Sequence, residues 1–331
     1  MNFAPTFMFG FERSGTTLLG MMVGAHPQIA VPMAVTGLWF RYARRLSEYN
    51  GLASDADCAR LVDDLLAEER IALWNAKLDR NALLDGLAVG SFGAIVERFH
   101  AQYARAHGKR LWANLEIQTL DDMDEVQRWF PDARFVHIVR DGRDVALSHR
   151  TMPYGAANLG DCAQSWLARV GTNLKMGAML PADRYLVLRY EDLVTDSNAV
   201  LARLCAFLGV EYSDAMLDYP RHVDSKVPAA KRWLWPTLDQ PPRSDGVGRW
   251  RGDLSAAEQG AFESIAGGLL ERLDYETVRI GRGRWRAQGL ELWYFLDRGG
   301  RWRRLRSRLG LARASRLERD WKRRQTGGDP S

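Results

Sequence analysis

The first residues that could do chemistry follow an apolar segment at the start of the chain. Gly10 and Gly15 have the spacing of a Walker A phosphate-binding loop, but the Lys of that motif is replaced by Thr16. The loop carries a cation at Arg13 instead, and hydroxyl groups lie beside it at Ser14, Thr16 and Thr17. With the free N–H groups of a helix start, these side chains can form an anion cradle that needs no metal. Taken alone, the loop fits such a cradle and a polar helix cap about equally.

The elements expected around this loop alternate between strands and helices. Apolar and β-branched runs predict strands over 5–9, 110–114, 134–139 and 185–189. Periodic apolar residues predict helices over 18–25, over much of 37–107, over 120–130, from 145, and over 201–208 and 256–273. Ser255 and Glu258 have the spacing of a capping box at the start of the last of these helices. The proline-rich segment 220–242 is expected to be irregular. This alternation predicts an α/β fold with a parallel sheet that helices cover on both faces.

A second constellation follows the clearest of these strands. Arg140 comes at the carboxyl end of strand 134–139, and Ser148 lies about one turn into the next helix. Ligands of parallel sheets bind beyond the strand ends, so an Arg and a hydroxyl there suit a second phosphate group. The alternative interpretation is a surface turn of solvated Arg and Asp side chains.

Both segments resemble motifs of the sulfotransferases that use 3′-phosphoadenosine 5′-phosphosulfate (PAPS). The form Arg-Ser-Gly-Thr-Thr-Leu-Leu at 13–19 is similar to the bacterial and Golgi-type members, including the tyrosylprotein sulfotransferases. Val-Arg-Asp-Gly-Arg-Asp-Val-Ala-Leu-Ser at 139–148 resembles the 3′-phosphate motif. The resemblance implies a three-layer sandwich with a central parallel sheet, related to the P-loop NTPase fold. It also implies PAPS as cosubstrate and adenosine 3′,5′-bisphosphate (PAP) as product.

The resemblance assigns roles to individual positions. The residues implied to hold the 5′-phosphosulfate are Arg13, Ser14, Gly15, Thr16, Thr17 and Leu18. Arg140 and Ser148 are implied to bind the 3′-phosphate, and Tyr190 in the Tyr-Glu-Asp-Leu segment to lie near the nucleotide. A late loop that folds over the nucleotide is matched by Gly248, Arg249 and Trp250.

Two positions depart from the family pattern. Ala34 stands where relatives carry a Glu that acts as general base, and Leu115 stands where relatives often carry a Lys. Three alternatives would explain why the Glu is absent at Ala34. The enzyme uses another base, the acceptor needs no base, or this chain is an inactivated variant. Glu116 is the candidate base among the remaining carboxylates, and a surface carboxylate after a strand is the equal alternative.

The function that these motifs predict is transfer of the PAPS sulfonyl group to a hydroxyl, or less readily to an amine. A small molecule, a carbohydrate and a peptide are all open as acceptors. The rival enzyme class is a P-loop nucleotide kinase or NTPase, which the missing Walker Lys disfavours. The other rival is a catalytically degenerate nucleotide-binding protein, which Ala34 and Leu115 favour.

Charged residues are distributed unevenly along the 331 residues, although the net charge is only +5. Residues 279–331 contain 16 Lys and Arg against 5 Asp and Glu, whereas residues 1–278 are net acidic. We therefore expect a catalytic domain over 1–278 and a basic, helical extension over 279–331. The extension could pack on the acidic body, or contact an acidic partner or a membrane surface. No base-reading motif is present, so nucleic acid is not an expected partner.

Targeting features are few. Cys58, Cys162 and Cys205 form no paired motif, which indicates a reducing compartment and no disulfide framework or zinc site. The chain shows neither a secretory signal pattern nor an apolar run long enough to cross a bilayer. These features predict a cytoplasmic location and no bound metal.

Overall fold

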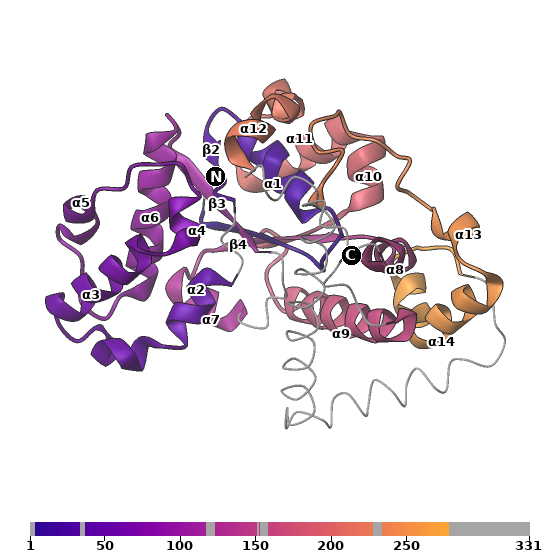
Figure 1. Ribbon diagram of the computed structural model, residues 1–331, viewed down its shortest axis with the longest axis horizontal. Coiled ribbons are helices and arrows are strands. Elements are labelled where there is room, and N and C mark those ends of the chain that lie inside the picture. The colour runs from indigo at the N-terminus through magenta and orange to yellow at the C-terminus, as the bar shows by residue number, and fades with distance from the viewer. Residues whose placement is uncertain are drawn as a thin grey trace, which may run out of the picture. The chain divides into compact units, whose positions relative to one another are not determined.

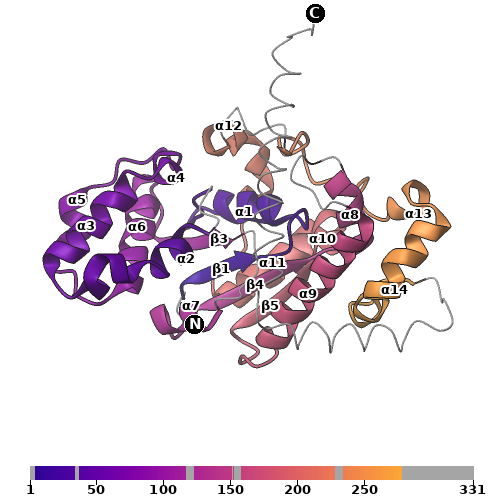
Figure 2. The same ribbon diagram turned by 60° about the horizontal axis from the view of Figure 1, so that its bottom comes forward.

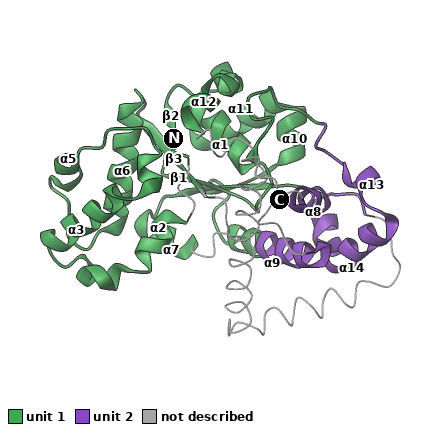
Figure 3. Cartoon of the chain, viewed as in Figure 1, with its two compact units in different colours: residues 1–140, 172–244 green, residues 141–171, 245–331 purple. Residues whose placement is uncertain are grey.

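The chain divides into two compact units (Figure 3). The structure is a computed structural model that describes residues 4–33, 37–116, 123–150, 152, 158–227 and 234–277. Unit 1 comprises residues 1–140 and 172–244, and unit 2 comprises residues 141–171 and 245–331. The predicted boundary at 278/279 falls at the edge of the described residues and stays a prediction, as do the structure and the partners of the basic extension.

Unit 1 contains a five-stranded parallel sheet of order β2-β3-β1-β4-β5 (Figures 1 and 2). The strands are β1 (Thr6–Phe9), β2 (Ile29–Ala30), β3 (Leu111–Glu116), β4 (Arg134–Val139) and β5 (Tyr185–Arg189). In the register, Phe9 lies opposite Glu116 on one side and His137 on the other. The carboxyl ends of β1, β3 and β4 therefore meet at one edge of the sheet.

Helices of unit 1 follow the predicted pattern, with ends that differ by a few residues. They are α1 (Thr16–Ala25), α2 (Leu38–Ala43), η1 (Leu46–Leu52), α3 (Asp55–Leu66), α4 (Glu69–Ala72), α5 (Arg80–Leu84), α6 (Phe92–Ala106), α7 (Met123–Trp129), α10 (Tyr190–Thr195), α11 (Ser197–Leu208), η2 (Asp214–His222) and α12 (Val223–Lys226). The expectation of irregular structure over 220–242 is wrong at its start, because η2 and α12 extend to residue 226. Pro220 is accommodated in the 3-10 turn, and Tyr219 and Val223 are buried beside it.

Side chains alternate across the sheet and give it two cores. Phe7, Phe9 and Phe135 pack with α2, α3, α6 and α7 on one face. Met8, Val136 and Ile138 pack with α1, α11 and η2 on the other face. Helix layers on both faces of a parallel sheet confirm the predicted three-layer α/β fold.

Unit 2 is helical in the part of it that the structure describes. Its helices are α8 (Gly142–Arg150), the first part of α9 (Leu159–Gly177), α13 (Trp250–Asp253) and α14 (Ala256–Arg272). Ser255 and Glu258 form the reciprocal capping box expected from their spacing, which fixes where α14 begins. Trp166 and Phe262 are fully buried and lie in contact, so they join α9 to α14.

The carboxyl end of α1 is held by two lysines from distant parts of unit 1. Lys109 Nζ donates to the carbonyls of Gly24 and Ile29, at 2.6 and 3.0 Å, and Lys226 Nζ donates to Gly24 at 2.8 Å. Burial lowers the pKa of both ammonium groups to about 8. Positive groups at a helix carboxyl end complement the helix dipole, so they help to fix the helix whose other end carries the glycine loop.

Two buried imidazoles make the stability of unit 1 sensitive to acid. Burial lowers the pKa of His100 to about 4 and that of His137 to about 3. Below pH 6.5 these imidazoles bind protons in the unfolded chain but not in the folded chain. The free energy of unfolding should therefore decrease as the pH is lowered. We expect a loss of about 2 kcal/mol per imidazole between pH 6.5 and 5. Urea unfolding of His137→Asn should then show a shallower pH dependence than the wild type. Equal slopes in the two proteins would contradict this.

Candidate active site

The loop between β1 and α1 has a backbone that glycine and a left-handed turn make possible. A Cβ on Gly10 would lie 2.4 Å from the carbonyl oxygen of Ile138, so only glycine lets the loop leave β1 this close to β4. Arg13 and Gly15 have φ values of 66° and 95°, and the Ser14 amide donates to the Phe11 carbonyl at 3.1 Å. The chain therefore makes a tight turn immediately before α1.

The amino end of α1 is open to an anion. No side chain caps it, and its first turn contains no acidic residue. The three hydroxyl-bearing residues predicted from the sequence are all buried here: Ser14, Thr16 and Thr17. Ser14 Oγ has no hydrogen-bond partner among the described residues. A buried polar atom without a partner costs free energy, so its presence beside unsatisfied helix N–H groups indicates a ligand-binding position.

Three motifs that are distant in sequence meet at this loop. Arg140, just after β4, donates from Nη1 to the Arg13 carbonyl at 3.0 Å. Its guanidinium lies 4.3 Å from the centre of the Tyr190 ring, at the start of α10. A Cβ on Gly15 would lie 2.4 Å from Cδ2 of that ring, which shows how closely Tyr190 packs on the loop. The structure thus brings Arg13, Gly15, Arg140 and Tyr190 together within unit 1.

The proline-rich segment also reaches the loop. Arg13 donates from Nη1 to the Leu234 carbonyl at 3.1 Å. Trp235 is half-buried against the core that contains α1, and Leu238 is buried in it. The described part of this segment therefore anchors the Arg13 side chain.

The end of β3 contains one of the two departures from the family pattern. Leu115 is buried, and its Cδ2 would lie 2.7 Å from a Cβ on Gly20 of α1. In this chain the position is therefore an apolar contact with α1, and a Lys introduced there would bring a charge into it. The backbone of Glu116 ends β3 beside Phe9, at the same edge of the sheet as the loop. Ala34 lies outside the described residues.

The remaining predicted positions belong to unit 2. Ser148 is half-buried on α8, Trp250 is buried at the start of α13, and Gly248 has a φ of 69°. The charges of the turn beside them are not solvated, because Asp141, Arg143 and Asp144 are all buried. We did not predict a role for these three residues; the only signal was their place directly after a fully buried strand.

A comparison with protein-family models decides the class. The model described as the sulfotransferase family matches residues 5–214, which include the glycine loop, Arg140 and Tyr190. The chain belongs to the sulfotransferase family. The predicted family and the prediction of a sulfotransferase enzyme are therefore confirmed.

Individual sulfotransferases resemble the chain over most of its length. It is 24% identical to protein-tyrosine sulfotransferase 2 of Gallus gallus and 23% identical to protein-tyrosine sulfotransferase 1 of Danio rerio. Both matches cover 82% of this chain, and they cover 69% and 72% of the relatives. The solved sulfotransferase domain of the Synechococcus PCC 7002 olefin synthase superposes with a TM-score of 0.58 at 23% identity. That superposition covers 84% of this chain and 98% of the domain, and it supports the sulfotransferase fold.

The predicted cytoplasmic location of this sulfotransferase is wrong. The relatives that match most of the chain are protein-tyrosine sulfotransferases, which are the Golgi-type members of the family. The prediction relied in part on three unpaired cysteines, but all three are buried: Cys58, Cys162 and Cys205. Thiols packed in a core are inaccessible to oxidation in any compartment, so they carry no information about location.

No helix among the described residues combines the length and the apolar character that a membrane span requires. Among the same residues, no group of three or more His, Cys, Asp and Glu side chains could hold a metal ion.

Proposed function

We propose that this sulfotransferase transfers the sulfonyl group of PAPS to a tyrosine hydroxyl of a protein acceptor. The observation that carries the proposal is the open amino end of α1, with the unpartnered Ser14 hydroxyl beside it. An uncapped helix start with buried hydroxyl donors suits the anionic phosphosulfate. The protein acceptor is supported by the relatives named protein-tyrosine sulfotransferases.

In this proposal the loop residues bind the reacting end of the nucleotide. Arg13 and the first N–H groups of α1 hold the 5′-phosphosulfate, and the hydroxyls of Ser14, Thr16 and Thr17 donate to its oxygens. These donors stabilise the negative charge that develops on the phosphate as its bond to sulfur breaks. The acceptor oxygen forms the new bond to sulfur, and Glu116 is the group we propose to take its proton.

The other predicted contacts keep the roles that their motifs imply. Arg140 is proposed for the 3′-phosphate, and Tyr190 and Leu18 for positions beside the nucleotide. Ser148 and the segment 248–250 are assigned to nucleotide binding from their motifs alone.

The test uses the full chain, PAPS labelled in the sulfonyl group, and two peptides that differ only by Tyr or Phe. Label should pass only to the Tyr peptide, and Glu116→Gln should lower turnover with unchanged affinity for PAP. Normal turnover in Glu116→Gln would rule out that residue as the base. Tight binding of PAP without transfer to any acceptor would identify a degenerate binding protein, and magnesium-dependent ATP turnover would identify a kinase or NTPase.

A further inference from the structure

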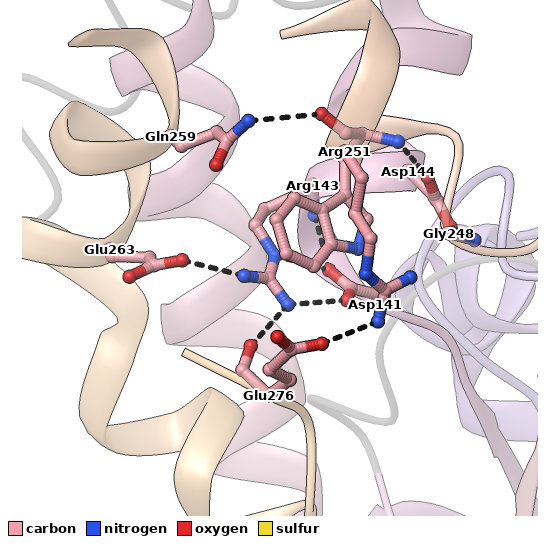
Figure 4. Close-up of polar contacts among 9 residues, drawn as sticks. Asp141, Arg143, Asp144, Gly248, Arg251, Gln259, Glu263 and Glu276 are labelled. Atoms are coloured by element: carbon pink, nitrogen blue, oxygen red, sulfur yellow. Dashed lines mark hydrogen bonds and ion pairs between the residues drawn. The ribbon is translucent and has the colours of Figure 1, made fainter. Parts of the chain in front are cut away.

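The carboxylate of Asp144 holds the backbone of the late loop. Its Oδ2 accepts from the Gly248 amide at 2.7 Å, and its Oδ1 accepts from the Trp250 amide at 2.9 Å (Figure 4). The side chain is buried, and hydrogen bonds to a buried carboxylate are among the stronger ones in proteins. Both carboxylate oxygens of Asp144 are therefore engaged in fixing the segment 248–250 to α8.

The neighbouring residue holds the side chain of the same loop. The Arg143 guanidinium is fully buried and lies 3.4 Å from the centre of the Trp250 ring. Ion pairs to Asp141 at 2.7 Å and to Glu263 at 2.6 Å fix the guanidinium, and Arg143 Nη2 also donates to the Glu276 carbonyl at 2.7 Å (Figure 4). Arg143 and Asp144 thus fix the indole ring and the backbone of Trp250 separately.

The same helix carries the predicted 3′-phosphate residue. Ser148 follows Asp144 by four positions, so the two side chains lie on the same side of α8. Any displacement of the segment 248–250 relative to Ser148 would have to break both hydrogen bonds to Asp144. The negative charge of the Asp144 carboxylate is compensated by the two amides that donate to it. A carboxylate is therefore tolerable near an anionic ligand at this position.

We propose that Asp144 is a positioning residue that orders Gly248, Arg249 and Trp250 beside Ser148, so that unit 2 presents a preformed surface for the 3′-phosphate of the nucleotide. This inference rests on the proposed function. The proposed role differs from a purely structural one, because Asp144 would affect the binding of one phosphate group of the ligand and not only the folding of the chain.

The test compares the affinities of the full chain for PAP and for adenosine 5′-monophosphate, which lacks the 3′-phosphate. In Asp144→Asn we expect the Kd for PAP to rise about 10- to 100-fold. The Kd for the monophosphate should change less than about twofold. Asp144→Glu, which keeps the charge, should recover most of the affinity for PAP. Arg150→Gln is the matched control, because Arg150 lies on the same helix as Asp144 and the substitution breaks only an exposed ion pair with Glu258 of α14.

Separate outcomes overturn the inference and the proposed function. If the wild type does not prefer PAP to the monophosphate, the proposed function fails, and the inference fails with it. If the wild type prefers PAP but Asp144→Asn binds it normally, or loses both nucleotides equally, only the inference fails. Should Asp144→Asn not fold, hydrogen exchange of the ligand-free wild type decides: slow exchange at the Gly248 and Trp250 amides supports the preformed surface, and fast exchange overturns it.

Discussion

Replacing Arg13 by Met should reduce kcat/KM for sulfotransfer about 10²- to 10³-fold. Arg13 is the cation of the glycine loop, and its backbone is already fixed by Arg140 and by a left-handed turn. Removing the guanidinium takes away the donor that we propose for the reacting phosphosulfate, together with its bond to the Leu234 carbonyl, while the backbone contacts of the loop remain. Turnover of PAPS and the Kd for PAP, measured on the same preparation, are the two readouts.

The two readouts separate catalysis from binding. PAP lacks the sulfonyl group, so its affinity should fall less than kcat if Arg13 stabilises the charge of the transfer step. Arg45→Met is a suitable control, since Arg45 is an exposed arginine whose ion pair with Glu48 lies on the surface. An Arg13→Met enzyme within fivefold of wild-type activity would exclude the proposed role.

Replacing Arg143 by Met should lower the free energy of unfolding of unit 2 by about 3–5 kcal/mol. The substitution leaves the Asp141 and Glu263 carboxylates buried without the guanidinium that pairs with both, and it removes the stacking on Trp250. A buried charge that loses its partner carries the full cost of its desolvation. Hydrogen exchange of α8 and α14, or urea unfolding, would measure the loss.

A second substitution sharpens this prediction. Adding Glu263→Leu to Arg143→Met should restore part of the lost stability. Arg150 lies on the same helix as Arg143, and Arg150→Met, which breaks an exposed pair with Glu258 of α14, should cost less than about 1 kcal/mol. Equal losses for Arg143→Met and Arg150→Met would refute the argument.

The sequence predicted the local parts of the site. Strands over 134–139 and 185–189 were predicted at their observed bounds, and the capping box at Ser255 was read from its spacing. The glycine loop, the helix after it and the position of Arg140 also followed from neighbouring residues. Such features are set by hydrogen bonds and dihedral preferences within a few residues, which the local sequence encodes.

Only the tertiary structure decided which of these parts touch. Arg140 packs on Tyr190 and bonds to the Arg13 carbonyl because β4 lies beside β1 in the sheet, a pairing that no short segment specifies. Burial of Leu115 against α1, and of Arg143 and Asp144 in unit 2, likewise depends on residues far away in the chain. The residue types alone, an Arg and several hydroxyls beside glycines, determined that the chain could bind an anion. The packing determined which charges are held inside as structural supports, because a charge can be buried only where distant partners compensate it.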